Sequence, residues 1–76
     1  MIVVPSPEQE FLKKMGLKIK GLRNEKHISL NDLANQFGFE KASISRLEAG
    51  KTNATTLTLF RLSEALSVPV SWFFVE

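Results

Sequence analysis

The chain has 76 residues, enough for one small domain with a modest core, and its ten Lys and Arg against eight Asp and Glu give a net charge of +2. Because the chain has no cysteine, a disulfide scaffold, a cysteine-bound zinc ion and a catalytic thiol are excluded. No apolar run approaches the ~18 residues of a membrane span and no signal peptide is recognisable, so we expect a cytoplasmic protein without membrane contact.

The first predicted helix runs from Ser6 to about His27. Ser6 can cap this helix, Pro7 suits its first turn, and an apolar stripe follows at helical spacing. The stripe consists of Phe11, Met15, Ile19 and Leu22. Ending the helix here places His27 in a left-handed backbone conformation, which histidine tolerates less easily than glycine. Residues 1–5 would precede the helix as an apolar extended arm, leaving residues 6–76 as a single domain.

Between Ser29 and Gly50 the pattern predicts two short helices joined by a tight turn. Ser29 can cap the first of them, and Gly38 can end it because glycine adopts the left-handed conformation without a Cβ penalty. The apolar face of that helix is formed by Leu30, Leu33, Ala34 and Phe37. The next helix has an apolar stripe formed by Phe39, Ile44 and Leu47, and an outer face formed by Lys41, Ala42, Ser43, Ser45 and Arg46. This arrangement is typical of a helix-turn-helix, whose second helix can lie in a DNA major groove.

The remaining residues predict a fourth helix and a short fifth one. Thr55 or Thr56 can cap the fourth helix, which runs to about Ser67 before Pro69 stops it. A last short helix can follow over Ser71–Phe74. The sequence therefore predicts an all-α fold, a compact five-helix domain in which helices 2 and 3 form the helix-turn-helix.

The stretch from Ser29 to Lys51 resembles the DNA-binding domain of the lambda-repressor-like, Cro-type family, also called the xenobiotic-response-element family. The residues that carry the likeness are Ser29, Asn31, Asp32, Leu33, Ala34, Gly38, Phe39, Ile44, Ser45, Arg46, Leu47, Glu48, Gly50 and Lys51. The likeness extends over about Met15–Phe74 and implies the lambda-repressor-like fold. It also implies a sequence-specific transcriptional regulator, which we expect to be a repressor that binds a short palindromic operator in double-stranded DNA as a homodimer.

Five residues of the third helix stand where this family reads DNA. Lys41 and Arg46 can donate to guanine O6 and N7 or to a phosphate. Ser43 can donate to a base or a phosphate, and Ala42 can meet a thymine methyl group. Ser45 belongs to the same outer face, and we expect all five residues to contact DNA.

Phosphate contacts are expected at both ends of the helix-turn-helix. Leu30 stands where the family has a glutamine whose amide touches a phosphate, and a leucine side chain cannot make that contact. We expect Ser29, Asn31 or the N-terminus of the helix itself to replace it, because the free amides of a helix N-terminus favour an anion. Three further candidates follow the turn at Gly50, and these are Lys51, Thr52 and Asn53.

The resemblance also predicts an ion pair between Arg23, late in the first helix, and Glu48, at the end of the third. A bidentate pair of this kind would fix the third helix against the first. The sequence leaves open a second role for Arg23, contact with a DNA phosphate.

The C-terminus carries more apolar surface than a small core should absorb. We expect Val70 and Phe73 to close the core. Large exposed apolar patches usually mark interfaces, so we expect Trp72, Phe74 and Val75 to form the interface of a homodimer.

Other functional classes lack the residues that they need. The single histidine is His27 and the single aspartate is Asp32, and no carboxylate pair has catalytic spacing. We therefore expect no enzyme, no metal and no cofactor. Two alternatives to a stand-alone repressor remain. The chain could be the antitoxin of a toxin–antitoxin pair, which would also bind its toxin, or the controller protein of a restriction–modification operon.

Overall fold

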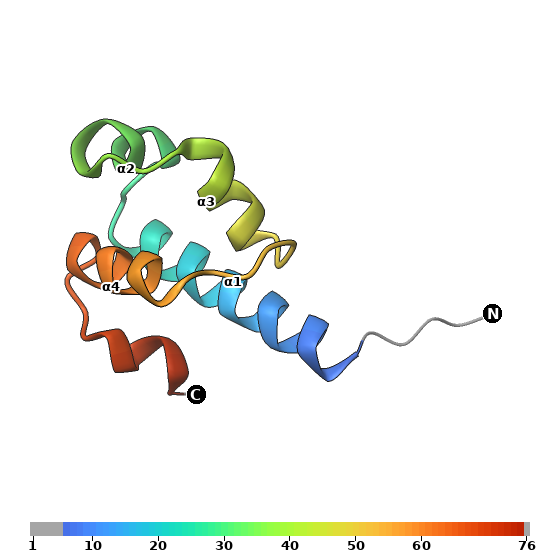
Figure 1. Cartoon of the computed structure of the whole chain (residues 1–76). Helices are drawn as coiled ribbons and strands as arrows, with labels where there is room; N and C mark the ends of the chain where they lie inside the picture. The colour runs from blue at the N-terminus through green and yellow to red at the C-terminus, as the bar shows by residue number, and fades with distance from the viewer. Residues whose placement is uncertain (1–5, 76) are drawn as a thin grey trace.

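The computed structural model describes residues 6–75, which contain four α-helices and one short 3-10 helix (Figure 1). These are α1 (Pro7–Glu25), α2 (Leu30–Phe37), α3 (Lys41–Glu48), α4 (Thr56–Ala65) and the 3-10 helix η1 (Val70–Phe74). The expected N-terminal arm, residues 1–5, lies outside the described residues, as does residue 76. None of the described helices is both long and apolar enough to cross a bilayer.

Local capping explains where these helices begin. The Ser6 hydroxyl accepts from the Gln9 amide, and the Gln9 side chain accepts from the Ser6 amide. Ser29 and Asp32 form the same reciprocal capping box at the start of α2, with distances of 2.9 and 3.0 Å. Thr55 caps α4 by accepting from the amide of the residue three positions on. The bounds predicted for α2 are confirmed, as is the choice of Thr55 or Thr56 as the cap of α4.

Left-handed residues follow all four α-helices, and Gly50 takes this conformation after α3 with a φ of 73°. Gly38 closes α2 with a φ of 73°, as predicted. His27 follows α1 with a φ of 58°, also as predicted, and Ser67 takes the same value after α4.

The expected last short helix is present as the 3-10 helix η1, so the described residues form four α-helices rather than five. Pro69 blocks extension backwards, and the five residues of η1 are too few for a stable α-helix, whereas 3-10 helices are used in such short pieces. Phe73 is buried as expected, but Val70 is 38% exposed. Val70 therefore does not close the core, because it lies at the first position of η1, directly after Pro69.

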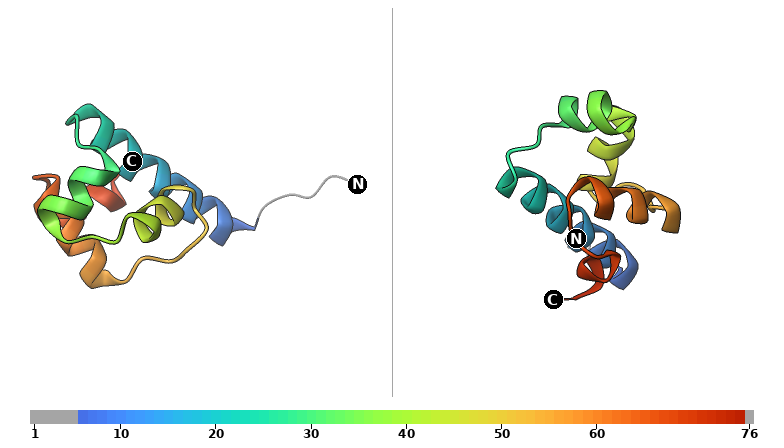
Figure 2. Two further views of the ribbon diagram at one scale, coloured as in Figure 1. Left: turned by 90° about the horizontal axis from the view of Figure 1, so that it is seen from above. Right: turned by 90° about the vertical axis from the view of Figure 1, so that its left-hand side faces the viewer.

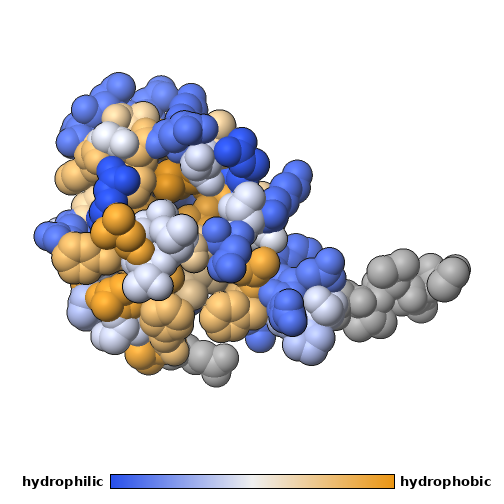
Figure 3. All heavy atoms as spheres, in the orientation of Figure 1, coloured by the Kyte–Doolittle hydropathy of each residue, from blue (hydrophilic) through white to orange (hydrophobic). Residues whose placement is uncertain are grey.

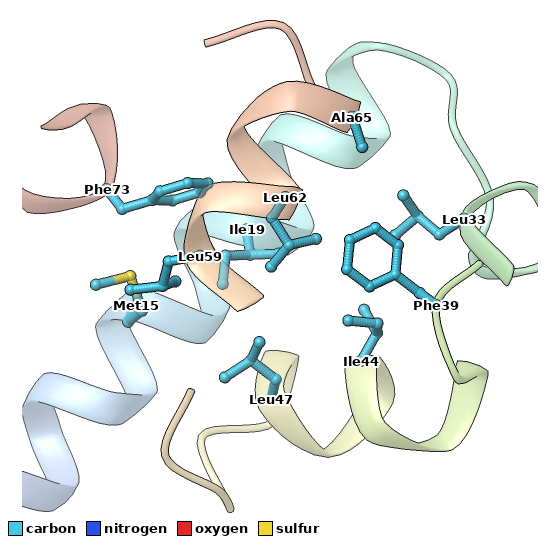
Figure 4. Packing of buried hydrophobic residues seen from close by; sticks show 10 residues of the cluster. All are labelled: Met15, Ile19, Leu33, Phe39, Ile44, Leu47, Leu59, Leu62, Ala65 and Phe73. Atoms are coloured by element: carbon cyan, nitrogen blue, oxygen red, sulfur yellow. The ribbon is translucent and has the colours of Figure 1, made fainter. Parts of the chain in front are cut away.

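The core draws on every helical segment (Figure 4). Its buried members are Met15, Ile19, Leu33, Phe39, Ile44, Leu47, Leu59, Leu62, Ala65 and Phe73. Ile44 and Leu47 of α3 point into this cluster toward Ile19 and Leu62. Their burial fixes which face of α3 is turned outward, as their spacing predicted.

Glycine lets α1 approach the end of α3 very closely. A Cβ atom on Gly16 would lie 2.4 Å from the carbonyl oxygen of Glu48. Gly50, in the turn after α3, has a φ of 73°, and its Cβ would lie 2.8 Å from the Cα of Lys13. Larger residues at these two positions would push α3 away from α1. In the resulting arrangement of helices, α2 and α3 lie on one side of α1 and α4, and η1 lies on the other (Figures 1 and 2).

Candidate nucleic-acid interface

The outer face of α3 presents polar side chains to solvent. Lys41, Ala42, Ser45 and Arg46 are exposed and Ser43 is half-buried, while Ile44 and Leu47 on the opposite face are buried. Figure 3 shows hydrophilic side chains gathered over α2 and α3, and apolar ones over α4 and η1. The five residues predicted to read bases thus share one polar face on a helix that the core holds rigidly.

Arg46 is only loosely held on this face. Its Nη2 atom lies 3.4 Å from the hydroxyl of Ser43 and 3.9 Å from the carboxylate of Glu40. About half of the Arg46 side chain is exposed, and an exposed pair at such distances contributes little to stability. The guanidinium can therefore leave these partners for a ligand at small cost.

A hollow of about 220 Å³ lies between α3, the following loop and the start of α4. It brings together four of the predicted DNA contacts, Ser43, Arg46, Thr52 and Asn53. Thr55 and Thr58 also line it, beside the apolar Ile44, Leu47 and Ala54, and the sequence had assigned neither threonine to the site. The sequence marked Thr55 only as a helix cap, and that role is real, because its hydroxyl accepts from the Thr58 amide at 3.1 Å.

A second hollow, of about 530 Å³, lies on the other flank of α3, against α1. Ser45 lines it, together with Lys13 and Lys20 of α1. The two lysines are seven residues apart, and both are exposed. That spacing places them on the same face of α1, two turns apart. They were not predicted, because their proximity to α3 depends on how closely the two helices pack.

The residues on both flanks of α3 suit a helix that lies in a DNA major groove. A duplex presents phosphates along both edges of that groove, and α3 has polar or basic side chains on both sides. The arrangement can therefore hold base-reading groups in the centre and phosphate-binding groups at the margins.

The remaining predicted phosphate contacts, Ser29, Asn31 and Lys51, line neither hollow. Ser29 and Asp32 are occupied with each other in the capping box. The Ser29 backbone amide is the main reason, followed by its hydroxyl, that the pKa of the Asp32 carboxyl lies below its usual value. The carboxylate therefore stays ionised at the N-terminus of α2, the position at which a phosphate was expected. The Asn31 side chain remains for an anion there, whereas the Ser29 hydroxyl could contact one only by giving up its hydrogen bond to Asp32.

Arg23 and Glu48, for which an ion pair was expected, meet beneath α3. Nε of Arg23 donates to Oε2 of Glu48 at 2.7 Å, and Nη2 donates to Oε1 at 2.9 Å. Nη1 donates to the carbonyl oxygen of Ile28 at 2.9 Å. Hydrogen bonding to Glu48 raises the pKa of Arg23 above its ordinary value, so the pair stays charged. Both side chains are buried and all three Arg23 nitrogens are engaged, which favours the structural role over contact with a phosphate.

The three residues predicted for a homodimer interface differ in their exposure. Phe74 and Val75 are 59% and 61% exposed, whereas Trp72 is partly buried against the core. The Nζ atom of Lys18 lies 4.7 Å from the centre of the Trp72 ring, and it donates to the Trp72 and Val75 carbonyl oxygens. Trp72 therefore has an intramolecular role that the sequence did not reveal.

Phe74 and Val75 also border an open apolar hollow of about 580 Å³ beside α1. Phe11 and Leu17 line the same hollow, and they are 55% and 62% exposed. Within residues 6–75, no group of three His, Cys, Asp or Glu side chains comes together to hold a metal ion.

Comparison with known proteins gives a consistent set of similarities. A family model described as Helix-turn-helix (HTH_3) matches residues 19–73. The chain is 36% identical over 59 residues to an uncharacterised HTH-type transcriptional regulator, y4dJ of Sinorhizobium fredii, and the match covers 78% of this chain and 77% of that protein. It is also 36% identical over 59 residues to the HTH-type transcriptional repressor RghR of Bacillus subtilis, where the match covers 76% of this chain but only 44% of the repressor.

A solved structure is similar over nearly its whole length. The restriction-modification controller protein C.AhdI from Aeromonas hydrophila superposes with a TM-score of 0.78 and 27% identity. The superposition covers 83% of this chain and 96% of that chain.

Proposed function

Because the chain belongs to the helix-turn-helix (HTH_3) family and is a DNA-binding transcriptional regulator, we propose that it is a repressor that binds a short palindromic operator as a homodimer. The observation that carries the proposal is the exposed polar face of α3, set between two polar or basic flanks on a rigid core. We also propose a cytoplasmic location for this regulator.

In this proposal α3 lies in the major groove. Lys41 and Arg46 donate to guanines, and Ala42 meets a thymine methyl group. Ser43 and Ser45 lie on opposite flanks of the helix, and each contacts a base or the nearer phosphate backbone.

Phosphates on either side of α3 would be held by different elements. The loop after α3 and the start of α4 serve one strand through Thr52, Asn53 and Thr55. Lys13 and Lys20 of α1 serve the other strand, and Ser29, Asn31 and Lys51 add contacts further out.

Dimerisation follows from the limited reach of one recognition helix. A single short helix reads only a few base pairs, and two copies placed about 34 Å apart read two half-sites one turn of DNA apart. Phe74 and Val75 are exposed on the side of α1 and α4 opposite to α3, where an interface would not block DNA. Trp72 would hold η1 against α1 beneath this surface through its contacts with Lys18.

A second candidate function, control of a restriction–modification operon, is favoured by one observation. The described fold matches 96% of the controller protein C.AhdI. A controller and a repressor would use the same DNA-binding face, so the two proposals differ in the regulated gene and share the mechanism.

Sedimentation at micromolar concentration tests the homodimer. We expect the wild type to be a dimer, and Phe74→Asp to be a folded monomer that binds operator DNA far less tightly. Phe37→Asp is a matched control, because Phe37 is also an exposed phenylalanine, 40% exposed on α2, and distant in the fold from η1. The control should stay dimeric. A strictly monomeric wild type would contradict the homodimer.

A further inference from the structure

One acidic side chain lies at the start of the recognition helix without a structural partner to explain it. Glu40 is the N-cap residue of α3, with an extended backbone and no capping hydrogen bond from its side chain. The helix thus begins without the capping contact that Ser, Thr, Asp or Asn usually supplies. The Glu40 side chain is 73% exposed, so its carboxylate is available to a ligand.

Glu40 is also isolated among acidic residues. Between residues 33 and 63 the only other acidic residue is Glu48, which is buried against Arg23. The whole DNA-binding face of α3 and its following loop therefore carries one exposed carboxylate. Within residues 6–75, Glu40 forms an ion pair with Arg46 at 3.9 Å, and breaking an exposed contact of that length costs little.

DNA phosphates repel a carboxylate at this position whatever the base sequence, and this repulsion alone weakens binding. The carboxylate becomes favourable only where a base offers a hydrogen-bond donor. The N-terminal residues of a recognition helix contact base edges, and Glu accepts from the N4 amino group of cytosine in the major groove.

The other exposed side chains of α3 also favour a site rich in G·C pairs. Lys41 and Arg46 suit guanine, and the helix contains neither Asn nor Gln, the side chains that pair with adenine. We infer that Glu40 is a specificity-determining residue that accepts a hydrogen bond from a cytosine N4 amino group, so that each operator half-site contains a G·C pair at its position. This inference rests on the operator-binding function proposed above.

Selection from a randomised duplex library tests the inference, with the wild type, Glu40→Gln and Glu40→Ala compared. The wild type should enrich a palindrome with one strongly preferred cytosine in each half-site. Glu40→Gln should shift that position toward adenine, and Glu40→Ala should lose the preference there by about tenfold or more, as measured by competition between duplexes that differ at that base pair. All other positions should keep their preferences.

Glu64→Gln is the matched control, because Glu64 is an exposed acidic residue on α4. It removes the same charge from a position outside both flanks of α3, so it should leave every base preference unchanged. If Glu40→Gln keeps the wild-type preference at every position and only lowers the melting temperature, Glu40 acts on the helix terminus alone and the inference is overturned. A wild type that enriches no sequence overturns the proposed operator function itself, and the role of Glu40 with it.

Discussion

The charged side chains on the two faces of α3 differ in burial and in how tightly they are paired. On the inner face, Glu48 is buried and receives two hydrogen bonds from Arg23 at 2.7 and 2.9 Å. On the outer face, Arg46 and Glu40 lie 3.9 Å apart with most of their surface in solvent. The buried pair has a single geometry and holds the helix in place, whereas the exposed charges are free to find partners on a ligand. Structural and functional charges on this helix should therefore be separable by mutation.

Removing the buried charge should have the largest effect on stability. Arg23→Ala leaves Glu48 buried without a partner, so we expect the free energy of unfolding to fall by about 3–5 kcal/mol in chemical denaturation. Replacing both residues, Arg23→Met with Glu48→Leu, should recover much of that loss. If the double variant also binds operator DNA like the wild type, Arg23 makes no important phosphate contact. An unfolding curve for Arg23→Ala that overlays the wild type would contradict a stabilising pair.

The close approach of α1 to the end of α3 can be tested with two glycines of α1. Gly16→Ala places a Cβ atom 2.4 Å from a backbone carbonyl oxygen, and overpacking of this kind costs about 1–3 kcal/mol. Gly21→Ala is the matched control, because nothing lies within 4 Å of the added atom. The control should gain about 0.5–1 kcal/mol from the better helix propensity of alanine. Thermal unfolding that shifts both variants in the same direction would refute the close approach.

Removing the outer charges should affect binding and leave stability nearly unchanged. Lys41→Ala and Arg46→Ala should each weaken operator binding by about 1–3 kcal/mol in gel-shift titrations. Their free energies of unfolding should stay within about 0.5 kcal/mol of wild type, because neither side chain belongs to the core. Wild-type affinity in the double variant would show that α3 does not read the DNA.

The smallest expected effect is a pH dependence at the start of α2. Hydrogen bonds from Ser29 lower the pKa of Asp32 below 3.8 in the folded protein. Asp32 should therefore stabilise the fold above pH 3.8, and this contribution should disappear as the pH falls below that value through the folded pKa. The difference in melting temperature between wild type and Asp32→Asn should be constant near neutral pH and shrink in acid. A difference that is the same on both sides of pH 3.8 would rule out this linkage.

The sequence by itself determined the features that depend on neighbouring residues. The bounds of α2, its cap at Ser29 and its end at Gly38 follow from capping and backbone conformation, which act over a few residues. The orientation of α3 follows from the spacing of Ile44 and Leu47, because helical periodicity decides which side chains face the core.

Only the tertiary structure decided the features that join distant parts of the chain. The contact of Lys18 with Trp72 spans 54 residues, and no local pattern signals it. The placement of Lys13 and Lys20 beside α3 depends on the interhelical distance that Gly16 permits. These features depend on how the helices pack in three dimensions, which propensity and spacing along one helix do not specify.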